Sequence, residues 1–165
     1  MKGAQVQGFK KKSGTFKENH KMVKILFVCH GNICRSPMAE YVMKDLVAKA
    51  GAQDRFHIAS AAVSREELGN PVYPPARREL QKHGILCSGH AAHQITREEL
   101  RAYDEIYYMD ESNARYLSRM FGAEAKKCAP LLPHDVADPW YTGDFTQTWN
   151  DVLEGCQAIL GKYLK

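Results

Sequence analysis

Cys29 and Arg35 are separated by five residues in a stretch that reads CHGNICRSP. An apolar run of strand length, residues 24–29, leads into this stretch, and a helical pattern follows it. A loop between the end of a strand and the start of a helix gathers backbone N–H groups around one point, and the helix dipole adds positive potential there. The stretch therefore predicts a loop that binds a tetrahedral oxyanion such as phosphate.

The loop itself supplies the groups that would hold the anion. Gly31, and Asn32 in a left-handed conformation, would give the backbone the unusual angles that let its amides converge. Arg35 would offer a planar fork to two phosphate oxygens, which the point charge of a lysine cannot match. The expected phosphate-binding residues are His30, Gly31, Asn32, Ile33, Cys34 and Arg35.

Cys29 is the expected nucleophile. The positive field of the loop favours its thiolate, which is the reactive form of cysteine, and the hydroxyl of Ser36 would add a donor. Ser36 is also the predicted N-cap of the following helix, with Pro37 at the first helical position. A thiolate in this place can attack the phosphorus of a bound phosphoryl group.

Two other kinds of site fit this stretch less well. A zinc site would need a second pair of ligands at a plausible spacing, beyond Cys29, Cys34 and the neighbouring His30. A nucleotide-binding P-loop would need G-K-[ST] after the glycine. We therefore expect neither a metal nor a cofactor.

Asp138 is the candidate acid. It lies in a proline-rich segment, APLLPHDVADPWYTGD, between the last predicted strand and the last predicted helix. An oxygen that leaves phosphorus departs poorly unless it is protonated, and a carboxyl group on a stiff loop can give that proton and later take one from water. Asp138 is therefore predicted to act as general acid and then as general base.

The residues that must position these groups read as an α/β fold. Apolar runs of strand length lie at 24–29, 56–60, 105–109 and 126–128, separated by segments with helical period. This alternation predicts a parallel sheet with helices on both faces. Loops at the carboxyl ends of such strands border the ligand site. The expected helices are residues 37–50, ended by Gly51, and 75–83, 96–101, 111–121 and 145–162.

Charge and cysteine content exclude several classes of protein. The net charge of +4 comes from residues 1–21, where six lysines face one glutamate, so no nucleic-acid surface is expected. We expect residues 1–21 to be a basic, disordered extension without the apolar region of a secretory signal, and residues 22–165 to form one domain. Five cysteines without a C-x-x-C pair fit reduced thiols, which indicates a cytoplasmic protein. No stretch approaches 18 consecutive apolar residues, so no membrane association is expected.

Three motifs, FVCHGNICRSPMAE, MDESN and DPWYTGDF, resemble those of the low-molecular-weight protein tyrosine phosphatases, and the resemblance extends over residues 23–165. It implies a four-stranded parallel Rossmann-like sheet in a single phosphatase domain that acts as a monomer on tyrosine-phosphorylated proteins. It also implies metal-independent hydrolysis through a phosphoenzyme on Cys29, with phosphate bound by Arg35 and acid–base catalysis by Asp138. Trp140 and Tyr141 would then form walls of the substrate pocket.

The same resemblance implies a set of residues that support the loop: Asn32, Ser36, Ser60 and His90. Two departures from the family pattern stand out. His93 lies where an arginine is common, after a loose match to H-x-A-R. The segment SAAVSREELGN has Arg65, Glu66 and Glu67 where some members carry an aromatic pocket wall, so substrate preference cannot be copied from those members.

Three alternatives remain open. A thiol-dependent arsenate reductase of the same fold would use a further pair of closely spaced cysteines, and Cys87 has no such partner nearby in the sequence. A protein arginine phosphatase would, by the family resemblance, have threonine in place of Ile33. A phosphate-binding module without turnover would not need Asp138. Finally, Cys34 follows Cys29 by five residues and is a candidate redox partner that would trap an oxidised Cys29 as a disulfide.

Overall fold

The computed structural model describes residues 22–164, so the expectation for residues 1–21 lies outside the described part of the chain. Within it, four strands form one sheet in the order β2-β1-β3-β4, and every neighbouring pair is parallel. The strands are β1 (Val23–Cys29), β2 (Phe56–Ala62), β3 (Glu105–Tyr108) and β4 (Cys128–Pro130). The predicted α/β fold with a four-stranded parallel sheet is confirmed.

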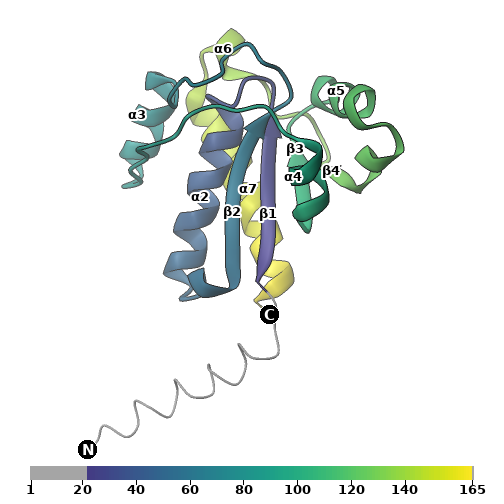
Figure 1. Cartoon of the computed structure of the whole chain (residues 1–165). Coiled ribbons are helices and arrows are strands. Elements are labelled where there is room, and N and C mark those ends of the chain that lie inside the picture. The colour runs from purple at the N-terminus through teal and green to yellow at the C-terminus, as the bar shows by residue number, and fades with distance from the viewer. Residues whose placement is uncertain (1–21, 165) are drawn as a thin grey trace, which may run out of the picture.

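Helices cover both faces of the sheet, as a parallel sheet requires (Figure 1). On one face lie α2 (Arg35–Lys49), α3 (Pro74–Lys82) and α7 (Phe145–Tyr163), which pack on Ile25 and Phe27 of β1. On the other face lie α4 (Arg97–Ala102) and α5 (Glu111–Phe121), which pack on Leu26 and Val28. Successive residues of the central strand thus enter opposite cores. None of the described helices has the length and apolarity needed to cross a membrane.

The start of α2 differs from the expectation. The helix begins at Arg35, with Cys34 at the N-cap position and no side-chain capping bond. The predictions of Ser36 as N-cap and of Pro37 at the first position are therefore wrong, and both residues lie inside the first turn. The physical reason is that the Ser36 hydroxyl is engaged by the loop, as described below, rather than by the helix. The other end is as expected, since Gly51 follows with φ +70°.

Two further differences concern the last third of the chain. The strand expected at 126–128 lies at Cys128–Pro130, because Gly122–Lys127 forms a 3-10 helix, η2, and Lys127 caps the backbone oxygens of Leu100 and Tyr103. A short helix, α6 (Pro139–Thr142), lies in the segment expected to be a loop. A second 3-10 helix, η1 (Gln53–Arg55), precedes β2.

The fold places the candidate site residues at one edge of the sheet. Cys29 is the last residue of β1 and pairs with Ala62 at the end of β2. Past the end of β3, the Met109 oxygen accepts a hydrogen bond of 2.8 Å from the Val136 amide, which draws the segment before Asp138 to the same edge. All these segments leave the carboxyl ends of parallel strands, where α/β sheets bind ligands (Figure 1).

Candidate active site

The loop between β1 and α2 turns its carbonyl groups away from the pocket. Four of these carbonyls accept hydrogen bonds from neighbouring segments. The pairs are the oxygens of Cys29 with Val63 N (2.9 Å), His30 with Ser64 N (3.1 Å), Asn32 with His90 Nε2 (2.7 Å) and Ile33 with Tyr73 N (2.9 Å). Because the oxygens are held on the outside, the N–H groups are left to line the concave side, which suits an anion.

Asn32 fixes the shape of this loop. It is fully buried and adopts the expected left-handed conformation, with φ 62°. Its Nδ2 donates to Ser36 Oγ (2.8 Å) and to Ser60 Oγ (2.9 Å), and its Oδ1 accepts from His93 N (3.3 Å). The hydrogen bonds offset the cost of a left-handed non-glycine residue. Asn32, Ser36, Ser60 and His90 therefore lie together around the loop.

Gly31 differs from the expectation, since its φ is not positive. The space beside it explains the small residue instead. A Cβ on Gly31 would lie 3.1 Å from Glu67 Cγ, closer than an ordinary van der Waals contact. Gly31 is therefore suited to the close approach of a neighbouring side chain rather than to a special backbone angle.

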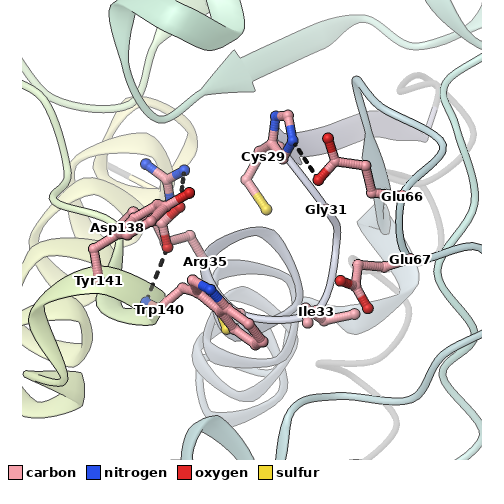
Figure 2. A pocket seen from close by; sticks show the side chains of 11 residues that line it. Cys29, Gly31, Ile33, Arg35, Glu66, Glu67, Asp138, Trp140 and Tyr141 are labelled. Carbon is pink, nitrogen blue, oxygen red and sulfur yellow. Dashed lines mark hydrogen bonds and ion pairs between the residues drawn. The ribbon is translucent and has the colours of Figure 1, made fainter.

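The sulfur of Cys29 lies at the focus of three polar groups. The amides of Asn32 and Ser36 each donate to Sγ at 3.3 Å, and Ser36 Oγ lies 3.1 Å from it. The Ser36 hydroxyl also lies 3.4 Å from the Ala61 oxygen, so the sulfur is the nearer acceptor for its proton. Donors aimed at a sulfur stabilise its anionic form, and Figure 2 shows the Cys29 side chain turned into the pocket.

Arg35 is held in place by carboxylates and by the backbone. Only 2% of its side chain is exposed, and its NH1 donates to Asp110 Oδ2 (2.6 Å) and to the Val136 oxygen (2.7 Å). NH2 makes a longer contact, 3.3 Å, with Asp138 Oδ2. Burial by itself lowers the pKa of the guanidinium, but the negative charges of Cys29, Asp138 and Asp110 outweigh burial and raise that pKa. Arg35 is therefore a fixed cation facing the loop.

Asp138 connects Arg35 to the aromatic side of the pocket, which is formed by Trp140 and Tyr141. Its Oδ1 accepts from the Trp140 amide at 3.0 Å, which makes Asp138 the N-cap of α6. This helix carries Trp140 and Tyr141, which are 52% and 84% exposed. The centroids of the Trp140 and Tyr73 rings are 4.9 Å apart, so Trp140 packs against Tyr73.

These residues surround one pocket of about 140 Å³. Figure 2 shows Asp138, Trp140 and Tyr141 on one side, Glu66 and Glu67 on the other, and Cys29 between them. The structure thus brings together the predicted nucleophile, anion-binding loop, acid and aromatic walls. The lining residues are Cys29, His30, Gly31, Ile33, Cys34, Arg35, Glu66, Glu67, Asp138, Trp140 and Tyr141.

Comparison with known proteins places this site in a family. The family model for low molecular weight phosphotyrosine protein phosphatase matches residues 24–165. The chain belongs to this family. The member from Rattus norvegicus is 40% identical over 150 residues, which are 84% of this chain and 94% of that protein.

Solved structures agree with the assignment to the family. The crystal structure of the low molecular weight protein tyrosine phosphatase from Streptococcus pyogenes is similar with a TM-score of 0.81 at 38% identity, over 87% of this chain and 95% of that one. A structure of a Drosophila arginine phosphatase is also similar, with a TM-score of 0.78 at 29% identity, over 87% and 99% of the two chains.

Two polar residues of this phosphatase site were missed by reasoning from the sequence. Asp110 accepts a hydrogen bond from Arg35. The available signal was the position of Asp110, within the motif MDESN, just past the end of β3. Glu40 is buried on α2 and accepts a bond of 2.6 Å from Ser60 Oγ, which in turn binds Asn32. A glutamate beside the apolar stripe of α2 was the available signal for the second residue.

His93, which stands where the low molecular weight phosphatases commonly have arginine, forms a pair with Glu99. His93 Nε2 lies 2.8 Å from Glu99 Oε2, and this hydrogen bond, acting against burial, raises the pKa of His93 above its ordinary value of 6.5. Because the folded-state pKa of His93 is raised, the pair stabilises the fold fully below pH 6.5, down to the pH at which Glu99 takes up a proton. That contribution is lost as the pH rises through the folded-state pKa.

We therefore expect His93→Gln to reduce stability more at about pH 6 than at about pH 9. Glutamine preserves the backbone contact to Asn32 but carries no charge. Because the His93 and Glu99 side chains are 46% and 25% exposed, the difference should stay below about 1 kcal/mol. Thermal unfolding of both proteins across this pH range, followed by circular dichroism, measures it. If the stability lost in His93→Gln grew with rising pH, the charged pair between His93 and Glu99 would be contradicted.

Proposed function

We propose that this protein is a metal-independent protein tyrosine phosphatase that works through a cysteinyl-phosphate intermediate on Cys29. The observation that carries the proposal is the convergence of two amides and a hydroxyl on Cys29 Sγ, beside the buried guanidinium of Arg35. Membership of the low molecular weight phosphatase family supports it. We also propose that residues 22–165 form a single phosphatase domain, and that the protein is cytoplasmic and monomeric.

The first step uses the contacts described above. The phosphoryl oxygens sit on the loop amides and on Arg35, and Cys29 Sγ attacks phosphorus while the bond to the tyrosine oxygen breaks. Arg35 NH1 remains tied to Asp110, whereas the longer NH2 contact to Asp138 at 3.3 Å is the one that phosphate replaces. Asp138 gives its proton to the departing phenolate.

The second step releases phosphate. Asp138, now ionised, takes a proton from a water molecule, and the oxygen of that water attacks the phosphorus bound to Cys29. The S–P bond breaks, which returns the thiolate to the field of the Asn32 and Ser36 amides. The same donors thus stabilise the attacking and the departing sulfur, so both steps gain from one arrangement.

Phosphate release from a peptide panel in the presence of a metal chelator tests the proposal. The panel carries phosphotyrosine, phosphoserine or phosphoarginine in one otherwise constant sequence. Turnover that is highest for phosphotyrosine and unaffected by the chelator is expected. Turnover that requires added metal, or that is highest for phosphoserine, would overturn the proposed reaction.

Arginine phosphatase is the second candidate, because the Drosophila structure shares the fold at 29% identity. Ile33 is the residue that separates the two activities. It is 8% exposed, lines the pocket and packs near Cys34 and Ala92, so it presents hydrocarbon to the atom that bears the phosphoryl group. A hydrocarbon suits the ring of phosphotyrosine but leaves a guanidinium without a partner.

Ile33→Thr is expected to raise the rate on phosphoarginine relative to phosphotyrosine by roughly ten- to a hundredfold, because the hydroxyl pairs with the polar substrate. Ile33→Val is the matched control, since valine has the shape of threonine without its hydroxyl. The ratio of kcat/KM for the two phosphopeptides is the measurement. If the valine variant moves the ratio equally, or if the wild type already prefers phosphoarginine, Ile33 does not select phosphotyrosine.

Cys34 is the proposed redox partner of Cys29. Burial, together with the negative charges of Cys29 and Asp138, raises the pKa of Cys34, so this residue is kept as a neutral thiol. Peroxide should therefore oxidise Cys29 first, to a sulfenic acid. The Cys34 sulfur then attacks the oxidised sulfur, a disulfide forms and water leaves.

We expect peroxide-inactivated wild-type protein to regain most of its activity with a dithiol, and Cys34→Ser to regain much less. Without the second thiol, the sulfenic acid of Cys29 proceeds to irreversible states. Activity before oxidation, after peroxide and after dithiol gives the recovered fraction. Equal recovery in both proteins would refute the protective role of Cys34.

A further inference from the structure

Two adjacent carboxylates form one side of the pocket. Glu66 and Glu67 follow β2 and line the same pocket as Cys29, opposite Trp140 and Tyr141 (Figure 2). The Glu66 side chain is 66% exposed at the rim, whereas Glu67 is half-buried beside Ile33. We call these two residues the acidic wall.

The acidic wall is held by its neighbours. Glu66 Oε1 lies 3.0 Å from His30 Nε2, and the His30 ring packs edge-on against Tyr116 at 5.4 Å. Glu67 Oε1 accepts a hydrogen bond of 2.7 Å from Asn70 Nδ2. The Glu67 side chain also lies close to the backbone of Gly31, where a Cβ would come within 3.1 Å of it. The carboxylates therefore have defined positions relative to the phosphate-binding loop.

Glu66 and Glu67 place two carboxylates at the mouth of the pocket. Arg35 is the one arginine or lysine among the described residues that line the pocket, and its guanidinium is already bound to Asp110 and Asp138. The field of Glu67 reaches the base of the pocket, where it adds to burial and to the charges of Cys29 and Asp138 in raising the pKa of Cys34. A substrate that carries only negative charge is repelled by the acidic wall. A positively charged residue of the substrate beside its phosphate offsets this repulsion.

We propose that Glu66 and Glu67 select phosphotyrosine segments that carry arginine or lysine directly next to the phosphotyrosine. The proposal rests on the phosphatase function proposed above. With the phosphoryl group at Cys29 and the ring between Ile33 and Trp140, the peptide backbone leaves at the rim, where Glu66 is exposed. A neighbouring residue of an extended peptide lies about 3.3 Å along the chain, within reach of the wall for a long basic side chain. Arginine can bind a carboxylate through two parallel bonds, so it should be favoured over lysine.

Peptides that differ at one position test this selection. The set has phosphotyrosine flanked on its N-terminal or its C-terminal side by arginine, alanine or glutamate. For exposed charge pairs, we expect wild type to prefer the arginine peptide over the glutamate peptide by roughly three- to tenfold in kcat/KM on one of the two sides, less at high salt. The double variant Glu66→Gln, Glu67→Gln should lose this preference. Glu154→Gln, an exposed residue of α7, removes one charge away from the pocket and should retain it.

Binding to Cys29→Ser protein separates this proposal from the proposed function. Fluorescence anisotropy of the same peptides measures selection without turnover, in the presence and absence of the two glutamine substitutions. A preference for arginine that disappears when both carboxylates are removed supports the proposal. If, in addition, the wild-type protein hydrolyses none of the peptides, that result overturns only the phosphatase assignment. Equal binding of the arginine and glutamate peptides by protein with the intact wall overturns the proposal. So does a preference for the arginine peptide that persists without both carboxylates.

Discussion

Cys29→Ser is expected to lower kcat on an aryl phosphate by at least about 10³-fold while phosphate still binds. The physical reason is that the Asn32 and Ser36 amides stabilise a thiolate at this position, whereas a serine hydroxyl stays protonated and is a weak nucleophile. The anion-binding amides and Arg35 remain in place, so affinity for inorganic phosphate should change little. Initial rates and isothermal titration calorimetry measure the two quantities.

Cys87→Ser is the matched control for this substitution. Cys87 is also a buried free cysteine, 8% exposed, but it does not line the pocket. Its replacement should leave kcat close to that of wild type. If Cys29→Ser keeps more than a few per cent of the wild-type rate, the covalent mechanism is wrong. If Cys87→Ser loses activity as severely, loss of a buried thiol rather than of the nucleophile explains the result.

The parts of the site that follow from local sequence were predictable. The spacing of Cys29 and Arg35 between a strand and a helix required a loop with converging amides, and the alternation of strands and helices required a parallel sheet. Asn32 could be predicted to be left-handed because asparagine tolerates that conformation. These features depend on short stretches of chain, in which spacing and residue type carry the information.

The parts that depend on contacts between distant segments were not predictable. Ser36 carries the local signature of an N-cap, but Asn32 and Cys29 compete for its hydroxyl, and the helix begins at Arg35, two residues earlier than predicted. Asp110 lies 75 positions from Arg35 in the chain, so no sequence spacing joins them. In both cases the tertiary partners decide the role of the residue, and a pattern along the chain does not contain them.

Removal of the Asp138 carboxyl group is the other change with a large expected effect. Asp138→Ala should slow the hydrolysis of aryl phosphates with poor leaving groups by about 10²- to 10⁴-fold. Good leaving groups, which depart without a proton, should be slowed much less. The slope of log kcat/KM against the leaving-group pKa, measured over a series of substituted phenyl phosphates, should therefore become steeper in the variant.

Asp138→Asn distinguishes this chemical role from a structural one. Asp138 also caps α6, where its Oδ1 accepts from the Trp140 amide at 3.0 Å, and the loss of that cap in the alanine variant would disturb the aromatic wall. Asparagine retains an oxygen for the cap but cannot transfer a proton at neutral pH. If both variants show the steeper slope, the carboxyl group acts as the acid. If asparagine restores the wild-type slope, or if alanine slows good and poor leaving groups equally, Asp138 serves to position Trp140 and Tyr141, and another group must protonate the leaving oxygen.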